Sequence, residues 1–326
     1  MTALHSKSSF QDGDTILLVD VASGSVASAL MQLSKNDCPK LYGEVRVPLT
    51  VGSRAVSHEI AAKVQKAVDE VLGHVGHIAA NLRQNQATLQ LGTIKAVHVY
   101  FGAPWVSATV SHTHRALQFA FEDEILRDLY RQVGSIAGDS AVTAYPFNGA
   151  AAHATRAILN ETMLVCILTG EVVELVVVEG VTPIAHATMP YGIHTIYRTL
   201  QSHAGLGTHA VQSLLTLTHQ TGEPLVVYAE PLQAVAEHLT EEFVETATEL
   251  VEQFAIHTIM VIADEHMGDW FARALTASTA TVELFPNGGV VRALRPKHLE
   301  DYIATLAPNP DLSLMMEALY SNRRSA

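Results

Sequence analysis

The chain has 326 residues, enough for one large or two medium-sized domains, and 48% of them are apolar, so sizeable hydrophobic cores are expected. Charged residues make up only 16%, and a formal net charge of −13 repels phosphate backbones, which argues against nucleic acid as a partner. No apolar run reaches the ~18 uninterrupted residues of a membrane-spanning helix, and the first residues are too polar for a signal peptide. Two cysteines are too few for a disulfide framework, so we expect a cytoplasmic protein.

The first half of the sequence predicts three short strands, a long helix and two further strands. Turn residues separate the three strands, which are expected over Ile16–Val21, Val26–Leu33 and Leu41–Pro48. Apolar residues three or four apart then predict a helix from Arg54 to about Leu82. The later strands of this half are expected over Ala96–Phe101 and Ala141–Tyr145.

The second half repeats this order. Three strands are again expected in succession, over Met163–Leu168, Val172–Val178 and Thr182–Thr188. Helical patterns follow over Ile193–His219 and Val235–Phe254, and then come strands over His257–Ala263 and Thr281–Phe285, with Gly288-Gly289 as a hairpin turn. Because each unit can bury its own core, the repeat predicts two domains, 1–150 and 151–326, with a polar boundary at about 147–160.

The tight turn of each unit consists of small residues. Asp20 ends the first strand and precedes Ser23-Gly24-Ser25, and the turn of the second unit contains Thr169-Gly170. Small residues let backbone N–H groups approach phosphate oxygens, and hydroxyl groups add donors. A carboxylate at the end of a strand can hold a hydrated Mg²⁺ ion. Taken alone, the first turn fits equally well a β-hairpin in which Asp20 caps the turn.

This order of elements resembles the actin-like ATPase superfamily, and within it the bacterial FtsA- and PilM-like proteins. Besides the first turn, the motifs that carry the resemblance are Met189-Pro190-Tyr191-Gly192 before a helix, Pro104-Trp105 after a strand and Asn148-Gly149. The resemblance covers most of the chain. It implies an α/β fold of two ribonuclease-H-like domains that face each other across a nucleotide cleft.

The resemblance also implies ATP and Mg²⁺ as cofactors. Asp20 would organise Mg²⁺ through water, and the residues that would contact the nucleotide are Ser23, Gly24 and Ser25 on one side and Thr169, Gly170 and Gly192 on the other. The sequence departs from the family at Ala22, where glycine is usual, and at Cys166, where aspartate is usual. The glycine pair of the adenosine loop is absent from Ala263-Asp264-Glu265.

These departures predict weak nucleotide binding with slow or absent ATP hydrolysis. A thiol is a poor ligand for a hard cation, so Cys166 is expected to be a small buried core residue, and no catalytic residue is assigned. Two functions stay open. One is a nucleotide-binding assembly or cytoskeletal scaffold of the pilus or cell-division type, which would bind protein partners, copies of itself or a peripheral membrane complex. The other is a nucleotide-free platform for protein interactions.

Three further patterns favour structural over chemical roles. His74 with His77, and His112 with His114, lack the additional ligands that a zinc site needs. The acidic residues Asp264-Glu265 are expected to begin a helix, because carboxylates suit the positive end of its dipole. The apolar segment Leu312–Tyr320 is expected to dock on the protein itself.

Overall fold

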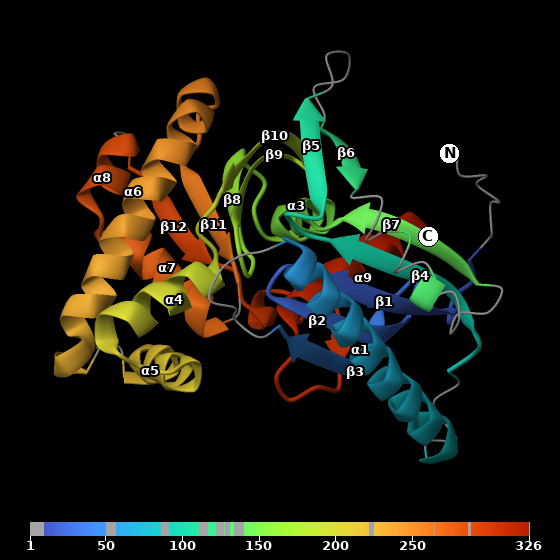
Figure 1. Ribbon diagram of the computed structural model, residues 1–326. Helices are drawn as coiled ribbons and strands as arrows, with labels where there is room; N and C mark the ends of the chain where they lie inside the picture. Colours follow the sequence, from blue (N-terminus) through green and yellow to red (C-terminus); the bar gives the residue numbers. More distant parts are fainter. Residues whose placement is uncertain are drawn as a thin grey trace.

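A computed structural model describes residues 10–49, 57–85, 91–110, 117–121, 127, 131–133, 140–221, 225–263, 265–285 and 288–325. Two large sheets stand side by side, and two helices lie between them (Figure 1). The α/β class and the pair of domains predicted from the sequence are confirmed. No described helix is long and apolar enough to cross a lipid bilayer.

The first sheet has six strands in the order β13-β3-β2-β1-β4-β7. The meander is antiparallel and consists of β1 (Thr15–Val21), β2 (Ser25–Gln32) and β3 (Lys40–Pro48). Parallel neighbours complete the sheet: β4 (Ile94–Phe101), β7 (Ala141–Pro146) and β13 (Ala304–Thr305). A separate antiparallel hairpin is formed by β5 (Val106–Val110) and β6 (Leu117–Phe121).

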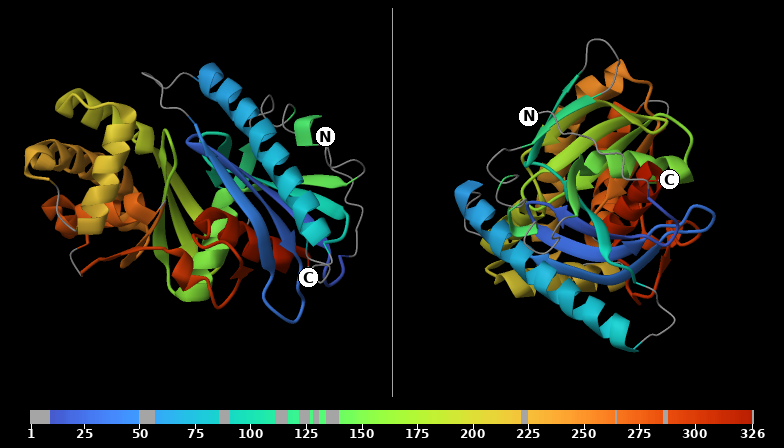
Figure 2. Two further views of the ribbon diagram at one scale, coloured as in Figure 1. Left: turned by 90° about the horizontal axis from the view of Figure 1, so that it is seen from below. Right: turned by 90° about the vertical axis from the view of Figure 1, so that its right-hand side faces the viewer.

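The long helix α1 (Ser57–Asn85) lies across one face of the first sheet (Figure 2). It buries the apolar stripe that the sequence predicts, including Val64, Val68, Val71 and Val75, against side chains of β1, β2 and β4. His74 and His77 of this helix are exposed, whereas His112 and His114 lie outside the described residues. Among the described residues, no group of three or more possible ligands is arranged to hold a metal ion.

The second sheet has five strands in the order β10-β9-β8-β11-β12. Its antiparallel meander is β8 (Met163–Leu168), β9 (Val173–Glu179) and β10 (Thr182–Met189), and its parallel strands are β11 (Thr258–Ile262) and β12 (Val290–Ala293). One face is covered by α4 (Ile193–Ala204), α5 (Thr208–Thr221), α6 (Ala229–Gln253), α7 (Glu265–Ala277) and α8 (Thr279–Leu284).

The helices α3 (Phe147–Ile158) and α9 (Leu312–Ser325) pack against each other between the two sheets. Four buried alanines of α3 share one apolar cluster with side chains from both sheets and from α9: Ala150, Ala151, Ala152 and Ala154. The segment expected to be a polar boundary is therefore a buried helix. The docking of the last apolar segment on the protein is confirmed.

The chain crosses between the halves twice. After the second sheet it returns to the first, where Ala304 and Thr305 pair with β3 and α9 packs against β1 and β2. We propose that the boundary between the two domains lies near residue 150, at the first crossing. Residues 304–325 pack with the first sheet, although they follow the second sheet in the sequence.

Three element predictions in the second half differ from the structure. The helix predicted over Ile193–His219 is two helices, because Gly205 takes a left-handed conformation (φ 65°) that ends α4. The strand predicted over Thr281–Phe285 is wrong: these residues belong to α8, which the Ser278 side chain caps by accepting a hydrogen bond from the Thr281 N–H. Gly288-Gly289 therefore leads from a helix into β12 and is not a hairpin turn.

Candidate functional site

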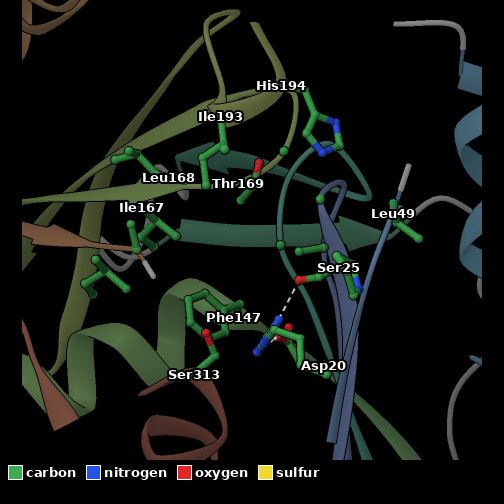
Figure 3. A pocket seen from close by; sticks show the side chains of 18 of the residues that line it. Asp20, Ser25, Leu49, Phe147, Ile167, Leu168, Thr169, Ile193, His194 and Ser313 are labelled. Atoms are coloured by element: carbon green, nitrogen blue, oxygen red, sulfur yellow. Dashed lines mark hydrogen bonds and ion pairs between the residues drawn. The ribbon is translucent and has the colours of Figure 1, made fainter. Parts of the chain in front are cut away.

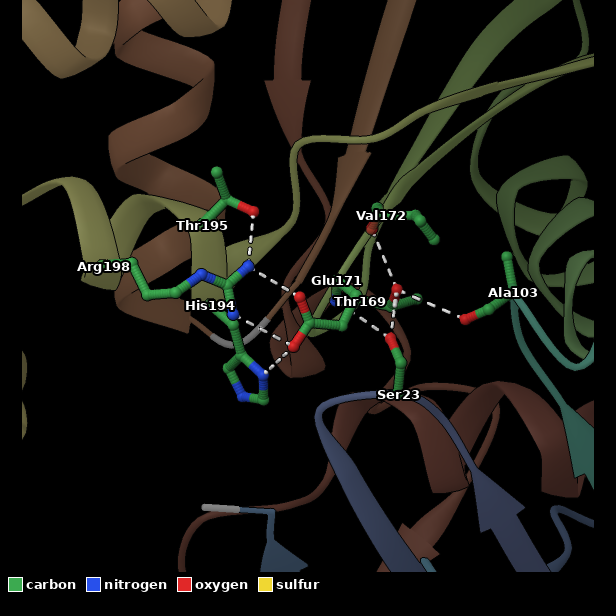
Figure 4. Close-up of polar contacts among 8 residues, drawn as sticks. All are labelled: Ser23, Ala103, Thr169, Glu171, Val172, His194, Thr195 and Arg198. Carbon is green, nitrogen blue, oxygen red and sulfur yellow. Dashed lines mark hydrogen bonds and ion pairs between the residues drawn. The ribbon is translucent and has the colours of Figure 1, made fainter. Parts of the chain in front are cut away.

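The two tight turns lie against each other where the halves meet (Figure 4). The Ser23 hydroxyl is 3.0 Å from the Thr169 hydroxyl and accepts a hydrogen bond of 3.0 Å from the Glu171 N–H. A Cβ atom added to Gly170 would lie only 2.4 Å from the Cα atom of Gly24. The two backbones are thus in direct contact, and the absence of a side chain at both glycines is what permits it.

Backbone hydrogen bonds give the two turns the same local form. The Ala22 N–H donates to the Ser25 carbonyl (3.0 Å), and the Thr169 N–H donates to the Val172 carbonyl (2.9 Å). Each turn therefore closes an antiparallel hairpin between the first two strands of its sheet. A hairpin backbone is common to both interpretations of the first turn, so it does not decide between them.

The start of α4 is fixed on the second turn. The N–H groups of Ile193 and His194 donate to the Thr169 and Gly170 carbonyls at 3.0 and 2.7 Å. Gly192 allows this approach, because an added Cβ would lie 2.4 Å from the backbone nitrogen of Val172. The first N–H groups of a helix are the usual donors to an anion, and two of those at α4 already have carbonyl partners.

Arg46 of β3 holds the Asp20 side chain. Its Nη2 donates to Asp20 Oδ2 at 2.8 Å, and its Nη1 donates to the Ser25 hydroxyl at 2.6 Å. The same guanidinium binds Asp311, just before α9, with Nε and Nη2 at 2.6 and 2.9 Å from the two carboxylate oxygens. A guanidinium thus stands beside Asp20 in the place where the resemblance implies a hydrated Mg²⁺ ion. Figure 3 shows Asp20 and Ser25 at this junction.

A third carboxyl group, Glu317 of α9, is buried beside this ion pair. Within the described chain neither of its oxygens has a hydrogen-bond donor. Burial and then the charge of Asp20 raise the pKa of Glu317 well above its usual range. Burial also raises the pKa of Asp20 against the opposing effect of Arg46, whereas at Asp311 the Arg46 guanidinium outweighs burial and lowers the pKa. We infer that Glu317 is the carboxyl group that stays protonated at neutral pH.

The protonated state of Glu317 predicts a pH-dependent gain from Glu317→Gln. In the unfolded chain this group titrates near 4.5, so above that pH the folded state binds a proton that the unfolded state has lost. The free energy of unfolding therefore falls as the pH rises from 4.5 towards the higher pKa of the folded state. Glutamine is neutral at every pH, so urea unfolding should show the variant more stable than the unmodified chain near neutral pH and nearly unchanged in acid.

The matched control is Glu283→Gln, the same substitution at an exposed glutamate of α8. A constant loss of stability in Glu317→Gln across the pH range would contradict the protonated assignment.

The second turn carries its own ion-pair network (Figure 4). Glu171 accepts hydrogen bonds from Arg198 Nη2 at 2.7 Å and from Arg198 Nη1 at 3.3 Å, and His194 Nδ1 lies 2.9 Å from the same carboxylate. Burial opposes ionisation, but the bonds to His194 and Arg198 prevail and lower the pKa of Glu171 to about 2. This network ties the second turn to α4 and leaves the Glu171 charge fully compensated.

A further link between the halves is formed by Glu174 of β9. Its buried carboxylate accepts a hydrogen bond from the Ala103 N–H, just after β4, and lies 3.4 Å from Nδ2 of Asn148 on α3. His186 of β10 is 3.4 Å from the same carboxylate. Contacts on both sides of the tight turns therefore hold the halves together.

A cavity of about 140 Å³ lies between the turns. The predicted site residues that line it are Asp20, Gly24, Ser25, Thr169 and Gly170, whereas Ser23 is buried between the turns and Gly192 lies behind the second turn. Pockets that hold a drug-sized ligand usually measure about 300–1,000 Å³. This cavity alone is smaller than that, and a second cavity of about 550 Å³ shares Arg46, Ala263 and Ser313 with it.

These residues do not fit Mg²⁺-ATP in the arrangement that the structure describes. Arg46 already compensates Asp20, Gly24 touches Gly170, and two N–H groups of α4 are occupied by carbonyls. Cys166 is fully buried among side chains that face the helices of the second half, so it points away from Ile167 and the cavity. Burial raises the pKa of its thiol, as suits a core residue.

The sequence analysis missed Arg46, Asp311, Glu317 and Glu174. Arg46 gave a signal, since it is a cation in the middle of a predicted strand, where a long charged side chain needs a partner. Glu317 gave a weaker one, as an acid within an apolar helical segment. Neither signal names the partner, because Asp311 is 265 positions from Arg46 in the sequence.

The arrangement of the elements can be compared with solved structures. The PilM–PilN type IV pilus biogenesis complex contains a chain that matches with a TM-score of 0.63, covering 96% of this chain and 98% of that chain at 12% sequence identity. The chain has the two-domain actin-like fold. The ethanolamine utilization protein EutJ from Carboxydothermus hydrogenoformans also matches, with a TM-score of 0.53 over 94% of this chain and 89% of that chain at 14% identity.

The actin-like resemblance seen in the sequence is thereby confirmed for the fold. No family model and no curated protein sequence matches the chain. Since identities of 12 and 14% carry information about fold alone, the function must be argued from the site itself.

Proposed function

We propose that this protein is an actin-like scaffold that binds partner proteins and does not hydrolyse ATP. The observation that carries the proposal is the Arg46 guanidinium, which lies 2.8 Å from Asp20 and 2.6 Å from Ser25. An actin-like protein that cycles with nucleotide needs a free carboxylate and free donors in its two turns. Here Arg46 engages the Asp20 carboxylate and the Ser25 hydroxyl. The Ala22, Thr169 and Glu171 N–H groups have acceptors within the chain, so the fold serves as a closed platform.

The likeness to PilM supports the choice of partner proteins. That chain was solved in a complex for type IV pilus biogenesis together with PilN, so an actin-like chain of this length can act by binding another protein. We propose a role of the same kind here, in a pilus-type or cell-division-type assembly in the cytoplasm, at the membrane only through partners. Self-assembly is the other form that such a scaffold can take.

A nucleotide-dependent scaffold with slow or absent hydrolysis is the second candidate. The cavity between the turns favours it, because Asp20, Ser25 and Gly170 line one space at the junction of the halves. For a nucleotide to enter, Arg46 must leave Asp20, and the backbones of Gly24 and Gly170 must separate. The two candidates therefore differ in whether the halves open.

Thermal unfolding in the presence of nucleotide distinguishes the two candidates. A ligand that binds only the folded state at about a thousand times its dissociation constant adds about 4 kcal/mol to the free energy of unfolding. We expect no change in melting temperature with millimolar Mg²⁺-ATP or Mg²⁺-GTP and no phosphate release. The matched control is Asp20→Asn, which should respond to nucleotide no differently from the unmodified chain.

A saturable rise in melting temperature with Mg²⁺-ATP that Asp20→Asn abolishes would establish the nucleotide-dependent candidate. Equal small rises with both nucleotides, also lost in Asp20→Asn, would mean that phosphate contacts dominate a weak site.

A further inference from the structure

An open groove lies between α7 and β12, at the side of the second sheet away from the first. Its volume is about 590 Å³. The floor is apolar and contains Ala272 and Ala277 of α7 with Val291 and Ala293 of β12. Around it stand three basic side chains, one acidic and one hydroxyl side chain: Arg273, Arg295, His298, Asp269 and Thr276. An apolar floor with a cationic rim suits a ligand that is both apolar and acidic.

The strand β12 forms the edge of the second sheet, on the outer side of β11 (Figure 1). It is parallel to β11, and the Val290 and Leu294 N–H groups donate to the His257 and Val261 carbonyls at 2.9 and 2.8 Å. In a parallel pair, alternate residues face the neighbouring strand. The backbone N–H and C=O groups of Val291 and Ala293 therefore point away from β11, and they have no backbone partner among the described residues.

An exposed strand edge of this kind is a template for another strand. Val290 is 45% exposed, and no bulge interrupts the register of β12 with β11. Both observations leave the edge open to an extended peptide that pairs with Val291 and Ala293.

Cations gather around this edge although the chain as a whole carries a net charge of −13. Arg273, Arg292 and Lys297 are exposed, and none of them has an ion pair with another described residue. Arg295 is different, because its guanidinium is compensated by Asp269 at 2.6 Å. Burial and then the charges of Lys297, Arg295 and Arg292 lower the pKa of His298, whose Nδ1 accepts a hydrogen bond of 3.1 Å from the Arg295 N–H.

The positions of two of the exposed cations match the two faces of an added strand. Val291 and Ala293 pack on the α7 side of the sheet, where Arg273 lies. Leu294 is buried on the opposite side, and Arg292, two residues before it, faces that same side. Side chains of a strand alternate between the two faces. One set of alternate side chains of an added strand would face the side of Arg273, and the other set would face the side of Arg292. An acidic residue in either set would therefore lie on the same side of the sheet as an arginine.

We propose that β12 and the groove beside it bind an extended acidic segment of a partner protein, which adds to the second sheet as a further strand. The proposal rests on the role of the protein as a platform for partners, but it uses no residue of the cleft. Main-chain hydrogen bonds to Val291 and Ala293 supply affinity, apolar side chains of the segment cover the floor, and the alternating carboxylates, on the other face of the added strand, pair with Arg292.

Fluorescence anisotropy with a labelled peptide of alternating valine and glutamate tests the proposal on the full chain. We expect saturable binding that weakens at higher ionic strength, and no binding of the matched valine–lysine peptide. With the valine residues on the floor, the glutamate residues face the side of Arg292, so Arg292→Glu should weaken binding about tenfold, as expected for a like charge placed in the interface. Lys95→Glu, the same reversal on an exposed residue at the start of β4, should leave binding unchanged.

Backbone pairing is tested on the peptide, so that the protein need not be altered. An added strand uses only alternate residues for hydrogen bonds to its neighbour. N-methylation of the glutamate residues and of the valine residues should therefore have unequal effects, with one peptide losing binding and the other keeping it. Val291→Pro should abolish binding as well, since its N–H is not used within the sheet and proline is tolerated at an edge.

Equal loss with both methylated peptides, or equal binding of the glutamate and lysine peptides, would overturn the proposal. Binding of phosphatidylglycerol vesicles with no peptide binding would also overturn it, in favour of a membrane surface. These outcomes are independent of the nucleotide experiment. A positive nucleotide experiment would overturn the proposed function of the cleft and would not affect the proposal for the groove. A peptide that does not bind would overturn the proposal for the groove and would not affect the proposed function of the cleft.

Discussion

Arg46→Ala is expected to lower the free energy of unfolding by about 3–5 kcal/mol at neutral pH. Removing one partner from a buried ion pair leaves the other charge uncompensated. Here the substitution leaves Asp20 and Asp311 without their cation, with Glu317 beside them. Urea unfolding followed by circular dichroism measures the loss. The loss should shrink in acid, because protonation removes the uncompensated charges.

Two controls separate the ion pair from the side chain as such. Arg46→Lys keeps the charge but lacks the planar fork that contacts Asp20 and Asp311 together, so it should lose an intermediate amount of stability. Arg292→Ala removes an exposed arginine that has no ion pair with a described residue, and it should change stability by less than about 0.5 kcal/mol. If Arg46→Ala behaved like Arg292→Ala, the guanidinium would not be what closes the cleft.

Gly170→Ala is expected to cost about 2–3 kcal/mol and to separate the two tight turns. The added Cβ would lie 2.4 Å from the Cα and 2.5 Å from the nitrogen of Gly24. Both are backbone atoms, so no change of rotamer relieves the overlap. Moving the turns apart would also break the contacts of Ser23 with Thr169 and with the Glu171 N–H.

Chemical unfolding together with limited proteolysis measures this effect, since a cleft that opens exposes backbone to the protease. Gly207→Ala is the matched control, because an added Cβ there meets no atom within 4 Å. Gly24→Ala should resemble Gly170→Ala, with its added Cβ 2.8 Å from the Gly170 Cα. Should both glycine variants of the turns be as stable as Gly207→Ala, the close contact of the turns would be disproved.

The local part of the fold was predictable because local patterns determine it. Alternating and continuous apolar runs placed both meanders, and small residues marked both tight turns around Gly24 and Gly170. The contact between the turns was predicted only as a shared cleft. The cleft is closed by the ion pair of Arg46 with Asp311, which come from distant segments of the chain. The hydrophobic period of a strand or helix contains no information about such a pair.

Two predictions were wrong for the same physical reason: the polar boundary at about 147–160 and the strand at Thr281–Phe285. In both, small or β-branched residues were interpreted without their tertiary surroundings. The alanine-rich segment of α3 resembles a linker in sequence, yet its small side chains are buried where α3 packs against α9. The segment of α8 contains threonine and valine, which favour strands, but the Ser278 cap and packing on α6 fix a helix instead.

The return of β13 and α9 to the first sheet has a consequence for folding during synthesis. Among the described residues, the buried members of the second apolar core come from positions 164–285, a continuous stretch of chain, so this core does not need residues 304–325. The first sheet emerges earlier but must wait for residues 304–325 to cover the edge of β3 and the inner face of β1 and β2. At about 5–20 residues per second, that wait after α3 is on the order of ten seconds or more. The half that is made first therefore waits longest for its last segment, and throughout that interval the edge of β3 that β13 later pairs with is open to other nascent chains.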